Sequence, residues 1–285
     1  MTSPVAVPHC YRHGDRETYI SCQRCGRPIC PDCMRQASVG FQCPECVAEG
    51  ASTVRPARTM AGGLVPGRVG IASMTLIGIN VAVFFVIVAT GGTDSEIYQK
   101  GVLIGGPFPE RFGIDGVADG AYWRMVTAAF IHLQLLHLLF NMYALAIFGP
   151  ILEQLLGHLR FVALYVLGAL VSSLVVYLLS PESPTIGASG AIFALFGAAI
   201  VLMLRRGQDV SNLLVLLAIN VFISFVVPNI SWQGHFGGLG AGLVVGLLFG
   251  YAPRQRRTIV HLVALGLMFV GIVVATLART ASLTG

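Results

Sequence analysis

Charged residues are scarce in this chain of 285 residues: Asp, Glu, Lys and Arg make up 11% of it, and hydrophobic residues 55%. An ordinary soluble domain is about 25% charged, so the composition excludes that class. After residue 69 the acidic residues lie in loops between apolar runs, with Glu153 as the exception. The opening stretch MTSPVAVPHCYRHGD lacks a basic segment followed by an apolar one, and we expect that it is not a cleaved signal peptide.

Cysteine is absent after residue 46, which sets a small N-terminal module apart. Seven cysteines and one histidine form four pairs, and two residues separate the partners of each pair. This spacing lets both side chains of a turn reach one metal ion, and eight ligands are enough for two tetrahedral zinc sites. A disulfide framework is the alternative, but an odd number of cysteines at regular spacing favours metal. The predicted ligands are Cys10, His13, Cys22, Cys25, Cys30, Cys33, Cys43 and Cys46.

The gaps between these pairs favour a cross-braced arrangement. Four residues separate the second pair from the third, whereas the outer gaps are eight and nine residues long. Pairs one and three would share one ion and pairs two and four the other, as in the B-box and RING-like treble-clef modules that this segment resembles. His9 is an alternative ligand to His13, which the spacing favours. No ligand position is left for water, so we expect two structural zinc ions that stabilise a fragment too small for its own core.

The rest of the chain predicts an all-α polytopic membrane protein. A helix needs about 20 apolar residues to cross the hydrocarbon core, and seven candidates occur, of which the fifth and sixth are short. We divide the chain into a zinc module (1–50), a flexible basic linker (51–69), a six-helix core (70–251), and a loop, seventh span and tail (252–285). The predicted spans are 70–90, 134–153, 161–179, 186–204, 212–227, 236–251 and 258–278.

The distribution of charge predicts the orientation. The connections expected inside contain GHLR, RRGQD and APRQRR, whereas those outside are acidic, which is the positive-inside asymmetry. Thiolate ligands also need a reducing compartment, so we expect a cytoplasmic N-terminus and an extracytoplasmic C-terminus. Spans rich in Ala, Gly, Val and Leu suggest a prokaryotic plasma membrane. The acidic residues expected outside are Asp94, Glu96, Glu110, Asp115, Asp119 and Glu182.

Ser189 and His235 are predicted to meet near the outer surface. Both lie near the outer ends of even-numbered spans, which run in the same direction: Ser189 about one turn into span four, His235 at the start of span six. A neutral imidazole is the usual base that activates a hydroxyl. Helix packing over small residues is the alternative interpretation, but a histidine in a membrane segment is costly and usually functional. The small residues that would let the helices approach are Gly187, Gly190, Gly238 and Gly242.

An oxyanion site is predicted on span two. No acidic residue is available near Ser189 and His235, because Glu153 lies at the cytoplasmic end, so a catalytic unit would be a dyad. His137 and Asn141 are spaced i, i+4 and share a helical face. An amide and an imidazole are suitable donors to an oxyanion. His132 is five residues earlier, and structural hydrogen bonding is at least as good an interpretation for it.

With these residues assembled, the chain resembles the rhomboid family of intramembrane serine proteases over residues 70–251. The resemblance implies that Ser189 is the nucleophile and His235 the general base. It also implies an oxyanion hole of His137, Asn141 and the Ser189 backbone amide. The motifs that carry it are Trp123-Arg124, His132-x4-His137-x3-Asn141, the Glu153 turn, Gly187-Ala188-Ser189-Gly190 and His235-x2-Gly238-x3-Gly242.

The resemblance assigns structural roles as well. Trp123 and Arg124 would belong with a membrane-dipping loop at 91–122, and a seventh span is a known variation of the family. Many members carry a tyrosine four residues after the nucleophile that stacks on the catalytic histidine. This chain has Phe193 there, whose ring face can still support the imidazole.

We therefore expect a serine endopeptidase that cleaves single-pass transmembrane substrates near the outer face, without a catalytic cofactor and without a nucleic-acid partner. The lipid bilayer is its environment, and the zinc module could dock a cytoplasmic protein. A non-catalytic rhomboid-like protein that binds transmembrane clients is the alternative, and it predicts loss of the nucleophile or base. A transporter or channel would place ionisable groups at the bilayer midplane, whereas the polar residues here gather in the outer half.

Overall fold

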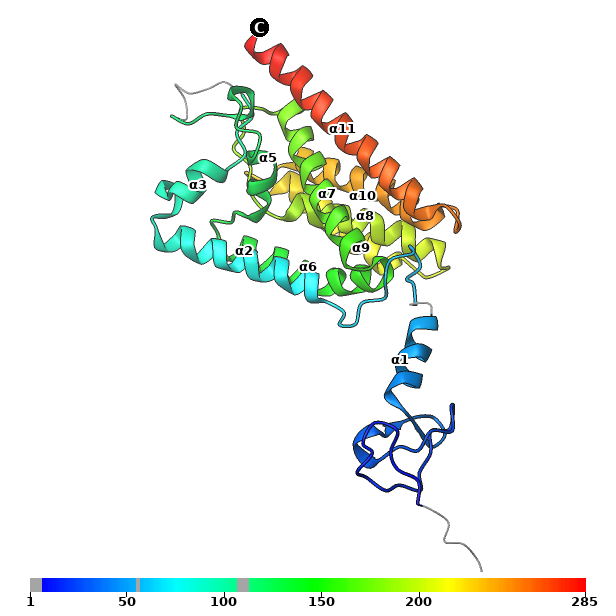
Figure 1. Ribbon diagram of the computed structural model, residues 1–285. Helices are drawn as coiled ribbons and strands as arrows, with labels where there is room; N and C mark the ends of the chain where they lie inside the picture. Colours follow the sequence, from blue (N-terminus) through cyan, green and yellow to red (C-terminus); the bar gives the residue numbers. More distant parts are fainter. Residues whose placement is uncertain (1–6, 55–56, 107–112) are drawn as a thin grey trace, which may run out of the picture. The chain divides into compact units, whose positions relative to one another are not determined.

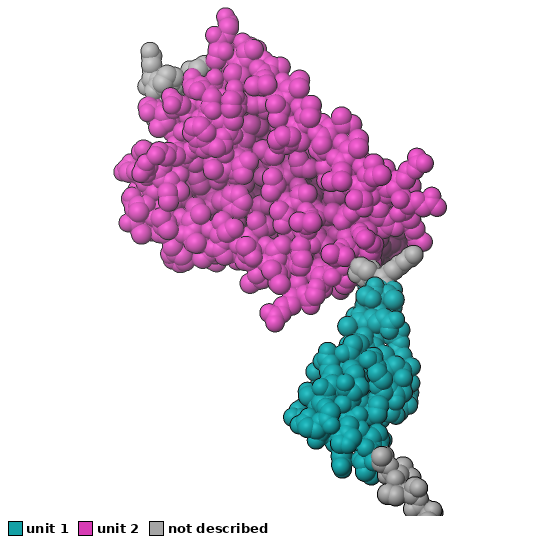
Figure 2. All heavy atoms as spheres, viewed as in Figure 1, with its two compact units in different colours: residues 1–57 teal, residues 58–285 magenta. Residues whose placement is uncertain are grey.

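The computed structural model describes residues 7–54, 57–106 and 113–285. The chain forms two compact units, residues 1–57 and 58–285 (Figure 2). Each is described by itself, because each has its own core.

The first unit is a short hairpin followed by one helix. A single turn of 3₁₀ helix (Pro31–Cys33) leads into β1 (Arg35–Gln36), which pairs antiparallel with β2 (Phe41–Gln42). Helix α1 (Pro44–Thr53) follows directly, with proline at its first position, where a missing N–H costs nothing. Its buried hydrophobic cluster is six cysteines and Ile29. So small an apolar core cannot hold a fold of this size alone, which agrees with a need for metal.

The second unit is a bundle of apolar helices (Figure 1). Five are long and apolar enough to cross a membrane, and α8 and α9 are shorter apolar helices. The described residues confirm the expected all-α polytopic membrane fold with a seventh C-terminal helix. The helices are α2 (Ile71–Ala89), α6 (Leu135–Leu156), α7 (His158–Leu179), α8 (Ser189–Arg205), α9 (Ser211–Val226), α10 (Trp232–Tyr251) and α11 (Arg257–Thr284).

Helix α8 is the central helix of the bundle. Twelve of its 17 residues are buried, whereas α9 buries only Leu213 and Ser224. Helix α10 packs along α8 over most of its length, and α7 packs against both. Apolar side chains exposed on α9 and α11 face outward, as expected of helices whose solvent is lipid.

The predicted starts of the two helices that carry the candidate site were wrong. Helix α8 begins at Ser189 rather than 186, because Gly187 has φ 116°, a conformation that no right-handed helix contains. Helix α10 begins at Trp232 rather than 236. The Ser231 side chain caps it by accepting from the Gly234 N–H at 3.2 Å. The sixth span therefore has 20 residues and is not short, and His235 lies one turn inside it.

A long connection joins α2 to α6. It contains α3 (Glu96–Gly101), α5 (Arg124–Thr127) and short 3₁₀ turns, while residues 107–112, with Glu110, lie outside the described part.

Trp123 and Arg124 fasten this connection. Arg124 is 3% exposed, and its Nη1 donates to the carbonyl oxygens of Gln99 at 2.7 Å and Val102 at 2.8 Å. Trp123 Nε1 donates to the Lys100 carbonyl at 2.9 Å. Both side chains therefore bind the end of α3, and neither hydrogen bond involves Ser189 or His235.

Glu153 caps a helix at the opposite end of the bundle. Its carboxylate is fully buried and accepts from the Ala72 N–H at 3.2 Å, the Ser73 N–H at 3.1 Å and the Ser73 hydroxyl at 2.8 Å. His158 Nδ1 lies 2.6 Å from the same carboxylate. These N–H groups are among the first of α2, where a helix has unpaired donors and its positive dipole end. Glu153 thereby ties α6 to the start of α2.

Part of the segment predicted as a flexible linker (51–69) has defined partners. Residues 58–64 form a turn within the second unit, and Ala61 in it is fully buried. Arg257, at the start of α11, donates through Nη1 to the Met60 carbonyl at 2.7 Å. Basic residues in this segment indicated a linker, but an arginine can equally donate hydrogen bonds to the carbonyl groups of a turn.

Candidate functional site

Ser189 and His235 are hydrogen-bonded. The distance between Ser189 Oγ and His235 Nε2 is 2.8 Å. Ser189 is the first residue of α8 and His235 the fourth of α10, so each lies in the first turn of its helix. His235 is 8% exposed, which leaves the imidazole largely surrounded by protein. This distance is within the range over which a base removes a proton from a hydroxyl.

Glycines bring the two helices close enough for that contact. A Cβ on Gly238 would overlap the carbonyl group of Gly190, and one on Gly242 would overlap that of Ala194. Gly190 in turn has Ser172 of α7 directly against its Cα. Such backbone-to-backbone contact is typical of membrane helices that meet over small residues. Packing and chemistry are therefore both served by the same glycines.

Phe193 and Ser224 hold the imidazole from two further sides. The Phe193 and His235 rings stack, with centroids 4.1 Å apart and an angle of 13° between their planes. Ser224 Oγ lies 2.6 Å from His235 Nδ1. Ser224 was not predicted, because only acidic residues were considered as a third partner of His235. A serine in the otherwise apolar run ISFVV, eleven residues before the histidine, was the available signal.

Asn141 and two histidines approach the start of α8. Asn141 Nδ2 donates to the His137 carbonyl at 2.9 Å and lies 3.3 Å from His132 Nε2. The same His132 nitrogen accepts from the Ala188 N–H at 3.4 Å, and His132 is fully buried. The His137 ring packs on Gly187, where an added Cβ would lie 2.6 Å from Cε1. His132 thus has structural partners, and His137 lies beside the turn that leads into Ser189.

The backbone at Ser189 is also suited to bind negative charge. The N–H groups of the first turn of a helix have no intrahelical partner, and the helix dipole is positive there. The Ser189 N–H is the first of these groups on α8. A pocket lined by Ser172, Gly190 and Ala191, among other residues, adjoins it.

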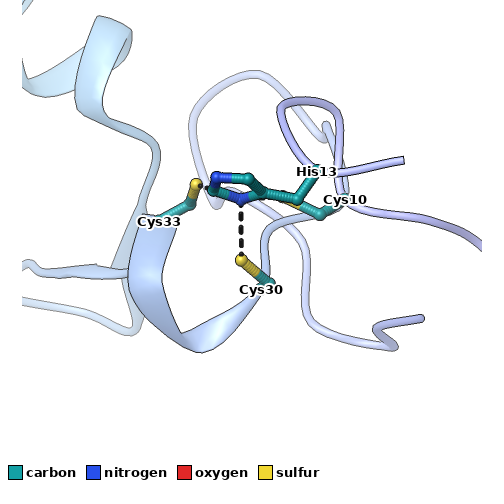
Figure 3. Close-up of side chains that lie close together, drawn as sticks. All are labelled: Cys10, His13, Cys30 and Cys33. Carbon is teal, nitrogen blue, oxygen red and sulfur yellow. Dashed lines mark hydrogen bonds between the residues drawn. The ribbon is translucent and has the colours of Figure 1, made fainter. Parts of the chain in front are cut away.

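One group of side chains that could hold a metal ion lies in the first unit. Cys10, His13, Cys30 and Cys33 converge, as Figure 3 shows. His13 Nδ1 lies 3.2 Å from the sulfur of Cys30, 3.5 Å from that of Cys33 and 3.8 Å from that of Cys10. Ligands bound tetrahedrally to zinc at about 2.0–2.3 Å lie about 3.3–3.8 Å apart, so the spacing fits that geometry.

A second group consists of Cys22, Cys25, Cys43 and Cys46. The Cys25 and Cys43 sulfurs are 3.8 Å apart, and all seven cysteines, which lie in the described part of the chain, are free thiols. Cys43 is the N-cap of α1 and Cys46 lies in its first turn, whereas Cys22 and Cys25 lie at a turn that precedes the 3₁₀ helix. Pairs one and three, and pairs two and four, are thus brought together, in the cross-braced order.

The cysteine thiols within each group differ in pKa. Burial raises the pKa of Cys10 and of Cys22, but hydrogen bonds from backbone N–H groups outweigh it and lower both to about 6. Burial, with neighbouring thiols, raises the pKa of Cys33 to about 11 and of Cys46 to about 12. Each group therefore has a thiolate beside a thiol that resists ionisation, and a bound metal ion would compensate the extra negative charge.

Comparisons with known proteins match the region of the chain that contains this site. The Rhomboid domain matches residues 119–252, which contain Ser189, His235, His137 and Asn141. A putative rhomboid protease YdcA of Bacillus subtilis is 37% identical over 148 residues, which are 50% of this chain and 74% of that protein.

Two longer relatives also match just under half of this chain. Rhomboid protease GluP of Bacillus subtilis is 34% identical over 139 residues, 47% of this chain and 27% of its own length. RHOMBOID-like protein 5 of Arabidopsis thaliana is 33% identical over 147 residues, 48% of this chain and 47% of its own length. The chain therefore spans less than half of either of these two relatives.

Proposed function

Because the chain belongs to the rhomboid family, we propose that it is an intramembrane serine endopeptidase whose nucleophile is Ser189 and whose general base is His235. The observation that carries the proposal is the 2.8 Å hydrogen bond between Ser189 Oγ and His235 Nε2. Protease-named relatives support the reaction class. We propose transmembrane segments as substrates, since the base and nucleophile belong to apolar helices.

The reaction follows the usual course of a hydroxyl nucleophile with an imidazole base. Ser189 Oγ attacks the peptide carbonyl carbon while His235 Nε2 takes the hydroxyl proton. The Ser189 N–H stabilises the oxyanion, with His137 and Asn141 as the further donors we propose. The imidazolium then returns its proton to the leaving amine, and an acyl ester remains on Ser189. Water, activated by His235, attacks that ester, so that acid is released and the serine is restored.

We further propose that cleavage occurs near the extracytoplasmic face. Ser189 and His235 lie at the ends of α8 and α10 opposite to Arg205 and Tyr251, and the arginine-rich connections follow those far ends. The positive-inside rule then assigns the dyad to the outer leaflet, with the N-terminus in the cytoplasm. Water reaches that depth, and a substrate helix can unwind there to expose a carbonyl. The pocket beside Ser189 is lined mostly by alanine, serine and glycine, which supports a small side chain at the cut. A prokaryotic plasma membrane remains our interpretation of the composition.

For the first unit we propose two structural Zn²⁺ ions. The four thiolates of one group and the three thiolates and imidazole of the other are donor sets that zinc prefers. With all four positions taken by protein, the ions would stabilise the fold and not take part in proteolysis. The unit is a candidate docking module for a cytoplasmic protein. Removal of residues 1–57 that leaves both cleavage and protein partners unchanged would argue against that role.

The test of the protease proposal uses wild type and Ser189→Ala in proteoliposomes. A model transmembrane substrate should be cleaved by wild type only, and a fluorophosphonate probe should label wild type only, because both need the Ser189 hydroxyl. Ser282→Ala is the matched control: its hydroxyl donates only to the Arg279 carbonyl near the end of α11, at 2.7 Å, and it should behave as wild type. Equal cleavage by Ser189→Ala and wild type would favour contamination or a different nucleophile. Client binding without cleavage or labelling by wild type would favour the non-catalytic alternative.

A further inference from the structure

We propose that Ser224 of α9 is a positioning residue that fixes the tautomer and rotation of the His235 imidazole. This inference rests on the proposed function, and it deepens it: beside Ser189 and His235 the catalytic unit would contain a third residue, the serine Ser224, on a third helix. Ser224 contacts neither substrate nor the reacting atoms, and its role would be exerted through the ring.

The geometry places a hydroxyl at each ring nitrogen. His235 Nε2 lies 2.8 Å from Ser189 Oγ, and Nδ1 lies 2.6 Å from Ser224 Oγ. Ser224 is 3% exposed, and it is one of only two buried residues on the whole of α9. The Ser224 side chain is therefore buried where it contacts the imidazole, whereas most side chains of α9 are not buried.

Proton counting then determines the tautomer. A serine hydroxyl has one proton to donate, and Ser224 donates it to the Asn220 carbonyl one turn earlier, at 2.7 Å. Towards His235 it can only accept, so Nδ1 must carry the ring proton. Nε2 is then the nitrogen with the lone pair, and it is the one that faces Ser189 Oγ. This is the tautomer that a general base requires.

The two contacts on the ring are complementary. Stacking on Phe193 fixes the plane of the imidazole. It still allows a half-turn of the ring about χ2, which keeps that plane, because the χ2 torsion of histidine is broad and roughly two-fold. The bond to Ser224 distinguishes the two orientations, because only one of them presents Nδ1 to a hydroxyl acceptor. After proton transfer the same Nδ1–H remains bonded, so the imidazolium keeps its partner.

The experiment compares Ser224→Thr with Ser224→Val, which have nearly the same shape and differ in the hydroxyl. Cleavage of a model transmembrane substrate in proteoliposomes gives kcat and KM separately. We expect Ser224→Val to lower kcat about tenfold with KM little changed, the size of one lost hydrogen bond to the base, and Ser224→Thr to stay within about threefold of wild type. Thr276→Val is the control, because it removes a buried hydroxyl that makes the same i−4 bond, at 2.8 Å, in α11.

A second readout does not depend on cleavage. The ¹⁵N chemical shifts of labelled His235 in detergent report which nitrogen is protonated. Wild type and Ser224→Thr should show Nδ1–H, whereas Ser224→Val should show a mixture with Nε2–H.

The outcomes separate the two proposals. Equal losses of kcat in Ser224→Thr and Ser224→Val, or an unchanged tautomer in Ser224→Val, would overturn the positioning role while leaving Ser189 as nucleophile. If wild type does not cleave at all, the protease proposal fails, and the ¹⁵N shifts still decide whether Ser224 sets the tautomer. If Ser224→Val does not fold while Ser224→Thr does, the shifts of wild type alone must show Nδ1–H, and Nε2–H there refutes the inference.

Discussion

The contact between α8 and α10 predicts a large effect of one methyl group, in Gly238→Ala. A Cβ there would lie 2.8 Å from the carbonyl carbon of Gly190 and closer still to its oxygen. Carbon atoms pack at about 3.5–4.0 Å, so the helices must separate by about 1 Å. Gly190 follows Ser189 directly, and Gly238 lies three residues after His235. The separation therefore acts on the Ser189–His235 hydrogen bond itself.

The size of the loss follows from that displacement. Opening the 2.8 Å bond by about 1 Å takes it beyond the 2.6–3.2 Å over which a base accepts a proton. We expect kcat to fall about 100-fold, as misplacements of this size do, and the free energy of unfolding to fall by about 1–3 kcal/mol from overpacking.

The assay measures substrate cleavage, fluorophosphonate labelling of Ser189 and thermal unfolding in detergent. The matched control is Gly240→Ala in the same helix, because a Cβ at Gly240 meets nothing within 4 Å. That variant should cleave normally and be as stable as wild type or slightly more stable, since alanine is a better helix former. If Gly238→Ala cleaved and unfolded like Gly240→Ala, the helices could not be as close as described.

Two other predictions concern the Cys30 group of the first unit and the Glu153 cap of the second. Cys30→Ser should lower the bound zinc measured by mass spectrometry and expose the first unit to limited proteolysis, because the His13 imidazole loses its nearest sulfur. Fluorophosphonate labelling of Ser189 in the same variant should be unchanged. Glu153→Gln should lower the free energy of unfolding by about 2 kcal/mol, because an amide nitrogen would face the N–H donors of α2. Well below the melting temperature, labelling of Ser189 should persist. A melting temperature equal to that of wild type would contradict this account of the cap.

Residue spacing predicted which side chains converge, both in the two Cys/His groups and at Ser189 and His235. Pairs at a gap of two residues are a local geometric requirement, so the two groups of four residues and their cross-braced order could be predicted without a structure. The agreement of Ser189 and His235 in depth needed only the count of spans between them. The comparisons confirm the rhomboid resemblance, and the structure brings the two side chains together.

Conformational details were harder to predict, for physical reasons. Hydropathy does not show where a helix begins, so the turn at Gly187 and the cap at Ser231 moved two boundaries. The contact of Ser224 was not predicted, because a hydroxyl inside an apolar helical run normally donates a hydrogen bond to the carbonyl four residues earlier. That it also reaches His235 depends on how α9 is rotated against α10, which no short-range pattern specifies.

The use of serine at both nitrogens of His235 has a consequence for how such a site can be built. Within the described part of the chain, neither ring nitrogen bonds to a carboxylate. A carboxylate orienter would have to be carried into hydrocarbon as an ion, or as an acid that no longer accepts the ring proton. With two alcohols and a neutral ring, the whole arrangement can assemble during insertion without any ion crossing the lipid, and under the proposed mechanism charge arises only during bond cleavage.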